Sequence, residues 1–321
     1  MAEWIQDPPD QRTTGVLSMS QLEWELENAQ VGSAGVGTLE GELEAELEGE
    51  LESEGEWELD GVAQREMELV TTGAEYNVYG RDDRILVQNT RIAPFRYIAK
   101  LEMVFVDPRT RAPRHFLGTG ALVAPGKVLT AAHCVFDRQH GYGYAQQIRV
   151  IPGKNGPGRS RGEEPFGFAM SRRLDVPTNW RTAPRTSQGG HSALPHDFAV
   201  ITLDRPIGRR VGGWWKRIAH KTDTFLSQHR VNTSGYPGDK GGNRQYRVYN
   251  RIVRVHPQRL EYIHDVMGGQ SGSPIWVRWQ NFRVIVGIVT THDDPFTAVH
   301  ANTGVRITPA VLTDVNRWLR T

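Results

Sequence analysis

Short apolar segments, separated by glycine, proline and asparagine, follow one another from about residue 76 to the C-terminus. This spacing is typical of an all-β sandwich or barrel, because each segment has the length of a strand and each break contains turn-forming residues. So many short strands argue against a parallel sheet with helical crossovers. The segments that predict strands are 98–106, 116–123, 128–132, 147–151, 198–203, 231–234, 246–255, 274–279 and 282–290.

The last residues have the pattern of an amphipathic helix. Thr308 is a suitable N-cap, and Pro309 suits the first helical turn. Leu312, Val315 and Leu319 then share one face. We expect this helix to pack on the β-structure and to carry no chemistry of its own.

Residues 1–75 have a different pattern and are expected to form a disordered acidic leader or pro-segment. From residue 39 to residue 60 every even position is acidic, which gives 11 acids in 22 residues. Strict alternation favours a strand, but leucines also recur there every four residues, so the period is ambiguous. A segment with this charge density cannot form a packed core alone.

The charge changes sign along the chain. Residues 1–76 contain 20 acids and two arginines, a net charge of −18, whereas residues 77–321 contain 17 acids and 36 bases, a net charge of +19. The overall charge of +1 is therefore the sum of two oppositely charged parts. Such asymmetry suggests an acidic tail or a masking partner within the chain, so a contact between the leader and the basic remainder is the alternative to a solvated leader.

Cysteine content and hydropathy exclude an intramolecular disulfide and an ordinary membrane-spanning helix. Cys134 is the only cysteine, so no intramolecular disulfide can form. The chain has no run of 18 apolar residues, and its N-terminus, MAEWIQDPPDQ, lacks the basic start and apolar core of a secretory signal. We therefore expect neither a membrane span nor an ordinary signal peptide.

The candidate nucleophile is Ser271, which lies in the glycine-rich stretch GGQSGSP at 268–274. A serine hydroxyl needs a histidine to accept its proton and a carboxylate to orient that histidine. His133 ends the β-type segment VLTAAHC, and Asp197 directly precedes the apolar strand segment FAVITL, where a buried carboxylate must have a partner. The order His133, Asp197, Ser271 is the order of chymotrypsin-like proteases and differs from that of subtilisins and α/β-hydrolases.

Three motifs together, TAAHC, DFAVITL and GGQSGSP, resemble the trypsin-like serine protease superfamily. The stretches VYGRDDR at 78–84, SGYPGDK at 234–240 and GVRIT at 304–308 narrow the resemblance to its V8-like glutamyl endopeptidase branch. It covers nearly all of residues 78–321. The resemblance implies two six-stranded antiparallel β-barrels with a C-terminal helix, in a domain at 76–321 whose barrels meet near residues 205–230.

The resemblance also implies roles for single residues. Ser271 would be the nucleophile, His133 the general base and then acid, and Asp197 the orienting carboxylate. The backbone N–H groups of Gly269 and Ser271 would form the oxyanion hole, where losing one donor costs about 100-fold to 1000-fold in rate. Cys134 lacks the partner cysteine of many relatives and is expected to be an ordinary buried thiol.

The sequence departs from the family in the pocket for the residue before the scissile bond. Val289 stands where glutamyl endopeptidases have a histidine, and Val266 where they have a hydroxyl residue. We therefore expect an apolar pocket that has lost the preference for glutamate, with residues 290–292, from Thr290 to His292, pairing their backbone with the substrate. If a bulge shifts that strand, His292 could restore acid recognition.

By resemblance the substrates are polypeptides. His292, Asp293 and Asp294 could suggest a metal site, but three adjacent residues rarely point at one ion, so no metal is expected. We also expect no cofactor and a monomeric protein. Relatives are secreted, which contrasts with the missing signal peptide and leaves the compartment open. Relatives also lose a pro-segment, and Val78 is the corresponding start of the mature chain. Activity of the uncleaved chain would argue against a zymogen.

Two other functions are considered. The first is a pseudoprotease used for binding, which the complete set of candidate residues disfavours. The second is a basic module that binds nucleic acid, because Arg209, Arg210, Lys216 and Arg217 surround Trp214 and Trp215. No recognised nucleic-acid motif is present, and a tryptophan pair more often packs than stacks on bases, so no nucleic-acid partner is expected.

Overall fold

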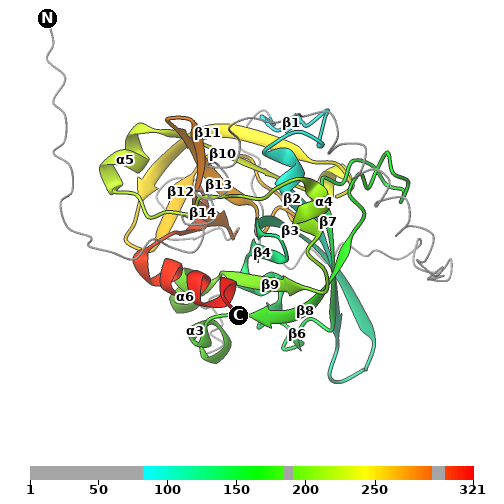
Figure 1. The fold of residues 1–321 in the computed structure, drawn as a ribbon. Helices are drawn as coiled ribbons and strands as arrows, with labels where there is room; N and C mark the ends of the chain where they lie inside the picture. The colour runs from blue at the N-terminus through cyan, green and yellow to red at the C-terminus, as the bar shows by residue number, and fades with distance from the viewer. Residues whose placement is uncertain (1–81, 184–190, 291–300) are drawn as a thin grey trace, which may run out of the picture. The chain divides into compact units, whose positions relative to one another are not determined.

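The computed structural model describes residues 82–183, 191–290 and 301–321 (Figure 1). The acidic leader at 1–75, the mature start expected at Val78 and the candidate His292 lie outside these residues. Six antiparallel strands form the first closed barrel, in the order β2-β3-β4-β9-β8-β7. Their bounds are β2 Ile98–Val106, β3 Pro113–Ala124, β4 Lys127–Thr130, β7 Gln147–Pro152, β8 Ala169–Asp175 and β9 Ala199–Leu203.

The second barrel also contains six antiparallel strands. They pair in the order β11-β10-β13-β14-β15-β12, and the pairing of β11 with β12 closes the ring. The short strand β1 (Ile85–Leu86) adds to the edge of β11. The bounds are β10 Arg230–Gly235, β11 Tyr246–Val255, β12 Arg259–Tyr262, β13 Pro274–Trp279, β14 Phe282–Val289 and β15 Asn302–Arg306. The expected fold of two six-stranded barrels with a C-terminal helix is therefore confirmed.

Short elements connect these strands. A two-stranded hairpin is formed by β5 (Phe136–Asp137) and β6 (Gly143–Tyr144), and short helices are α3 (Thr178–Thr182), α4 (Ile207–Val211) and α5 (Asp223–Gln228). The 3-10 turns are η2 Phe95–Tyr97, η3 Ala132–Cys134, η4 His191–His196 and η5 Gly238–Lys240. None of the helices in the described ranges is long and apolar enough to cross a bilayer.

The C-terminal helix α6 (Pro309–Leu319) begins as the sequence predicts. The hydroxyl of Thr308 accepts a hydrogen bond from the N–H of Val311 at 3.3 Å, and Pro309 occupies the first turn. Its most buried face contains Val311, Val315 and Trp318, whereas the sequence predicted Leu312, Val315 and Leu319. The buried face is therefore rotated by about one residue from the predicted one. In Figure 1 this helix lies beside β9, and the rings of Phe198 and Trp318 are 5.8 Å apart.

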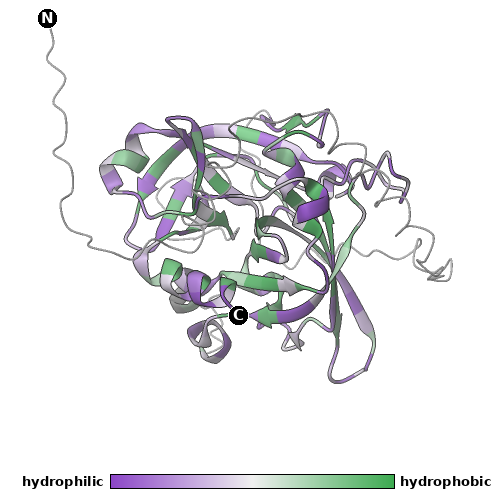
Figure 2. Ribbon diagram, viewed as in Figure 1, coloured by the Kyte–Doolittle hydropathy of each residue, from purple (hydrophilic) through white to green (hydrophobic). Residues whose placement is uncertain are grey.

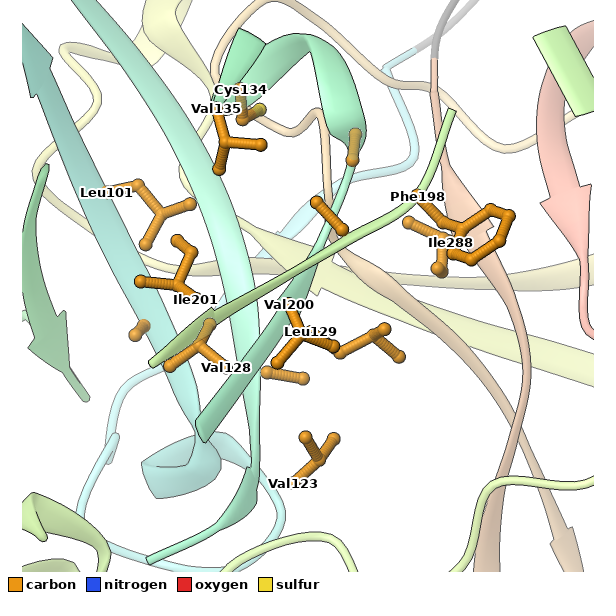
Figure 3. Close-up of a cluster of buried hydrophobic side chains, with 14 of the residues drawn as sticks. Leu101, Val123, Val128, Leu129, Cys134, Val135, Phe198, Val200, Ile201 and Ile288 are labelled. Carbon is orange, nitrogen blue, oxygen red and sulfur yellow. The ribbon is translucent and has the colours of Figure 1, made fainter. Parts of the chain in front are cut away.

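Two apolar clusters fill the barrels. The larger cluster combines the interior of the first barrel with residues of β13, β14 and α6, and Figure 3 shows Ile288 of β14 in the same view as Phe198, Leu129 and Val200. The second cluster fills the other barrel and includes Leu260 and Val286. Figure 2 shows hydrophobic residues concentrated in the strands and hydrophilic ones along the connecting segments. The larger cluster crosses the barrel boundary, so burial of apolar surface holds the two barrels together.

Candidate active site

His133 and Asp197 lie at the same end of one strand pair. In the pairing of β4 with β9, Thr130 is opposite Ala199. The chain leaves β4 after Thr130 and turns into the 3-10 turn η3, which contains His133. Asp197 comes two residues before Ala199, so the register of this pair brings the two side chains together.

The Asp197 carboxylate holds His133 at two points. Its Oδ2 is 2.7 Å from the ring Nδ1 of His133, and its Oδ1 accepts the backbone N–H of His133 at 2.9 Å. Asp197 is fully buried, whereas the imidazole is partly exposed. Burial disfavours the charged imidazolium, but the adjacent carboxylate outweighs this effect and raises the pKa of His133 well above its ordinary value.

Ser271 lies in a loop whose carbonyl groups are all engaged. The carbonyl oxygens of Met267 and Gln270 accept the N–H groups of Gln270 and Ser273, both at 3.0 Å. The remaining three acceptors are Gly268 O, bound by Gly238 N–H at 2.6 Å, Gly269 O, bound by Thr119 Oγ1 at 2.7 Å, and Ser271 O, bound by Thr119 N–H at 2.8 Å. Every carbonyl from 267 to 271 therefore points into the protein.

The backbone of Gly269 has a conformation that favours glycine. Its φ angle is +93°, and a Cβ atom there would come within 2.4 Å of the carbonyl oxygen of Tyr236, so only glycine fits. Its N–H has no acceptor among the residues that the structure describes. An N–H in this state, next to a serine, can donate to a substrate oxygen.

The Ser271 loop packs directly on the first barrel near His133. Gly272 has φ +85°, and a Cβ atom on it would lie 2.1 Å from both Thr119 O and Thr130 Oγ1. The Sγ atom of Cys134, the residue after His133, donates to Ser271 O at 3.7 Å. Cys134 is a buried free thiol, as expected. The structure thus brings Ser271, His133 and Asp197 to one place at the junction of the barrels.

Both valines of the expected substrate pocket are fully buried. Val266 and Val289 belong to the apolar cluster of the second barrel. Val289 is tied to the Ser271 loop, because its carbonyl accepts Gly272 N–H at 2.7 Å and its N–H donates to Ser273 O at 2.9 Å. Thr290 is also buried, and its N–H donates to Thr303 O of β15 at 3.4 Å.

A buried acid and a buried histidine precede Val266. The Oδ2 atom of Asp265 accepts the backbone N–H of Asp83 at 2.8 Å. Partial burial and the Asp265 carboxylate raise the pKa of Asp83 to about 6. His264 is fully buried, and burial lowers its pKa to about 4, so its ring is neutral at physiological pH.

Sequence reasoning missed the residues that support the Ser271 loop from a distance in the chain. Thr119 bonds Gly269 and Ser271 from strand β3. Gly238 bonds Gly268 from the turn η5. Gly238 lies inside the motif SGYPGDK, which indicated the family but did not predict its contact with Gly268.

The tryptophan pair considered for nucleic-acid binding is divided between core and surface. Trp215 is buried in the larger cluster, with its ring 5.3 Å from that of Trp276. Trp214 is only partly buried, and Lys216 Nζ lies 3.9 Å from the centre of its ring. Trp215 is therefore a packing residue and offers no ring for a base to stack on.

Comparisons with known proteins agree on the domain type. Residues 99–319 match the family described as Trypsin. A glutamyl endopeptidase of Bacillus licheniformis is 29% identical over 245 residues, which cover 75% of this chain and 69% of the relative. A Bacillus subtilis protein named extracellular metalloprotease is 26% identical over 257 residues, which cover 79% and 74%.

A solved structure adds a comparison of the fold itself. The structure of Glu endopeptidase in complex with MPD aligns with a TM-score of 0.61 at 29% identity, and the alignment covers 76% of this chain and 100% of the other. The family match extends over well more than half of the sequence, and the fold agrees with it. The chain therefore belongs to the trypsin family of serine endopeptidases.

Proposed function

We propose that this protein hydrolyses peptide bonds through an acyl-enzyme formed on Ser271, with His133 and Asp197 as its catalytic partners. Ser271 Oγ attacks the scissile carbonyl carbon while the imidazole of His133 takes the hydroxyl proton. The carbonyl π electrons move to oxygen, and the N–H groups of Gly269 and Ser271 stabilise the resulting oxyanion. Collapse of this intermediate breaks the C–N bond, and the imidazolium gives its proton to the leaving amine.

Water completes the cycle. It attacks the acyl carbon and passes a proton to His133, and the departing Ser271 oxygen then recovers that proton. Asp197 pairs with the imidazolium that forms in both halves of the reaction and stabilises it. It also fixes the tautomer of the neutral ring, with the proton on the nitrogen that faces the carboxylate.

The observation that carries the proposal is the two-point contact of Asp197 with His133. A carboxylate that binds only the ring would still allow the histidine backbone to shift, whereas this one also binds the backbone N–H of the same residue at 2.9 Å. The imidazole is therefore positioned before substrate arrives, which reduces the entropy cost of proton transfer.

Labelling with a serine-directed sulfonyl fluoride tests the proposal. Wild type should gain one sulfonyl group, located on Ser271 by peptide mapping, and lose its activity on a protein substrate. Ser271→Ala should remain unlabelled and inactive. A chelator added to wild type should leave its activity unchanged. Lack of labelling and of proteolysis in wild type would favour a binding role instead.

We further propose that the residue before the scissile bond is small or medium and apolar. The resemblance assigns Val266 and Val289 to the positions of carboxylate-binding side chains in glutamyl endopeptidases, and a valine side chain offers no donor to a substrate carboxylate. Placing an ionised glutamate there would be unfavourable by several kcal/mol.

A peptide library with every residue type at the cleaved position tests this preference. Wild type should cleave after valine, alanine or leucine in preference to glutamate. The double variant Val266→Thr with Val289→His should shift the preference toward glutamate. Strong cleavage after glutamate by wild type would contradict the proposed apolar pocket.

A further inference from the structure

Three consecutive residues, Asp82, Asp83 and Arg84, contact the loop at 265–271 or the turn that supports it. The guanidinium of Arg84 donates to the carboxylate of Asp239 twice, through Nη1 to Oδ1 at 2.9 Å and Nη2 to Oδ2 at 2.5 Å. Asp239 lies in the turn η5, next to Gly238. The N–H of Gly238 donates to Gly268 O at 2.6 Å, so Arg84 holds the turn that holds the loop.

Asp83 contacts the start of the same loop, at Asp265. The backbone N–H of Asp83 donates to the Asp265 carboxylate at 2.8 Å. Because Asp265 and Gly268 are only three residues apart, both anchors act on the short segment that leads into Gly269 and Ser271. We name residues 82–84 the clasp.

The ion pairs of the clasp fix it firmly. Arg84 is buried and also donates to Asp82, through Nε to Oδ1 at 2.9 Å and Nη2 to Oδ2 at 3.0 Å. Lys240 Nζ lies 2.8 Å from Asp82 Oδ2, which joins the clasp to the same turn a second time. Separating the buried guanidinium of Arg84 from its two carboxylates is costly, because a buried charge is then left unpaired.

The loop depends on such outside contacts. It contains two successive glycines, Gly268 and Gly269, and glycine loses more backbone freedom on ordering than any other residue. The residue before the nucleophile, Gln270, is uncharged, and its Oε1 accepts the N–H of Met267 from within the loop. Among the contacts of the described residues, the clasp therefore supports this segment at two points, at Asp265 directly and at Gly268 through the turn η5.

We propose that the clasp positions the Gly268–Gly269 peptide so that the Gly269 N–H is directed at the substrate oxygen, which makes Arg84 a positioning residue for the oxyanion hole. This inference rests on the proposed function of Ser271. The pairing of Arg84 with Asp239 uses side chains inside the chain, so it does not require a free α-amino group. The oxyanion hole is then formed whether or not the residues before 82 remain attached.

The test uses Arg84→Ala and Asp239→Ala in the full chain, singly and together, with Arg84→Lys as a milder variant. Each single alanine change should lower kcat by about 10-fold to 100-fold with little change in KM, because a displaced donor weakens only the transition state. The double variant should be no worse than Arg84→Ala, because Arg84→Ala already removes the contact that Asp239→Ala removes. Arg84→Lys should recover part of kcat.

Two further measurements separate positioning from general destabilisation. Affinity for a peptide aldehyde, which forms an oxyanion on Ser271, should fall in parallel with kcat, whereas affinity for an unreactive peptide of the same sequence should not. Arg317→Ala is the matched control, because Arg317 pairs with Asp314 at 2.7 Å on the surface of α6, away from the loop. Its kcat should equal that of wild type.

Hydrogen exchange of the peptide that contains residues 264–272 decides the matter independently of activity. Faster exchange in Arg84→Ala, or in Arg84→Lys if the alanine variant does not fold, supports the clasp. Unchanged exchange with unchanged kcat overturns it while the proposed function stands. If wild type is not labelled by a sulfonyl fluoride, the proposed function fails, and the exchange result still shows whether the clasp orders the loop.

Discussion

The hydroxyl of Thr119 in the first barrel donates to the carbonyl of Gly269 in the second at 2.7 Å, and the Oγ1 atom of Thr119 also accepts the N–H of Tyr236 at 3.1 Å. One side chain thus satisfies two buried backbone groups beside the nucleophile. Thr119→Val keeps the branched shape but removes both bonds. We expect the free energy of unfolding to fall by about 1–3 kcal/mol.

The same substitution should also affect turnover. Gly269 would lose the bond that turns its carbonyl inward, so kcat should fall by about 10-fold or more. Thr119→Ser keeps the hydroxyl and should retain most of the activity. Urea unfolding and steady-state kinetics on a peptide ester measure both effects, and equal kcat for the valine and serine variants would contradict the role assigned to Thr119.

Asp197→Asn tests the orientation of His133. An amide in place of the carboxylate favours the wrong tautomer of the imidazole and cannot stabilise the imidazolium, so kcat should fall by about 10⁴-fold. Asp314→Asn, the same change at a partly buried position on α6, serves as the control. A fall of less than about tenfold would exclude Asp197 from the proposed chemistry.

The pH dependence of activity should reflect the raised pKa of His133. The general base must be neutral, so kcat/KM should decrease as the pH falls through a pKa above the ordinary histidine value. In the residual activity of Asp197→Asn, this acid limb should move to lower pH because the carboxylate that stabilises the imidazolium is gone. The attraction between the His133 imidazolium and the Asp197 carboxylate also stabilises the fold, and this stabilisation is lost as the pH rises through the raised pKa of His133.

The buried ion pair of Lys154 and Glu164 should be important for stability and not for catalysis. Their charged atoms are 3.0 Å apart, both side chains are buried, and Arg149 also binds Glu164 at 2.6 Å. Glu164→Gln leaves a buried ammonium without its opposite charge and should lower the free energy of unfolding by about 3–5 kcal/mol. The adjacent Glu163→Gln is the matched control, and equal urea midpoints would contradict the prediction.

Asp83 should make stability decrease with rising pH. Its pKa is about 6 in the folded protein, above the ordinary value, so the unfolded chain loses this proton first as the pH rises. The stabilisation present at low pH is therefore lost between about pH 4 and pH 6. Asp83→Asn removes this pH dependence. As the pH rises from about 4 to about 6, the free energy of unfolding of the variant should increase relative to that of wild type by on the order of 1 kcal/mol, with allowance for solvent screening. Thermal unfolding at several pH values measures this difference.

Strands with continuous or alternating apolar residues were predictable from the sequence. The bounds of β2, β11 and β13 agree with the predicted segments, and those of β3, β4 and β7 differ by a few residues. Three barrel strands were missed, as were the two-residue strands β1, β5 and β6. β8 contains the consecutive polar residues SRR, β12 has only four residues, and β15 buries Asn302, Thr303 and Arg306 where apolar residues are usual.

The polar residues of β12 and β15 are buried because they have partners that no local pattern reveals. Glu261 lies within 2.5 Å of His256 and 3.5 Å of Arg259. Asn302 Nδ2 donates to His264 O at 2.7 Å, and Arg306 Nη2 lies 2.7 Å from an oxygen of Asp223. The partners of Asn302 and Arg306 are far away in the chain, and those of Glu261 are near but polar, so hydrophobic periodicity predicts none of these contacts.

The same limitation applies to the site. The motifs identified the candidate residues because each motif is local, and the register of β4 with β9 then brings His133 to Asp197. The supports of the loop, Thr119 and Arg84, are more than 140 residues from the groups they hold, with Thr119 separated from Gly269 by 150 positions and Arg84 from Asp239 by 155. Their sequence neighbourhoods contain nothing that specifies these partners.

The division of the site between two barrels has a consequence for biosynthesis. His133 and Asp197 belong to the first barrel, which a ribosome makes first, whereas Ser271 and its loop belong to the second barrel and rest on Thr119 and Thr130 of the first. Under the proposed chemistry, a nascent chain holds the base and its carboxylate long before it has a nucleophile. Proteolytic activity then arises only on completion of the second barrel, so an unfinished or half-folded molecule does not digest its neighbours.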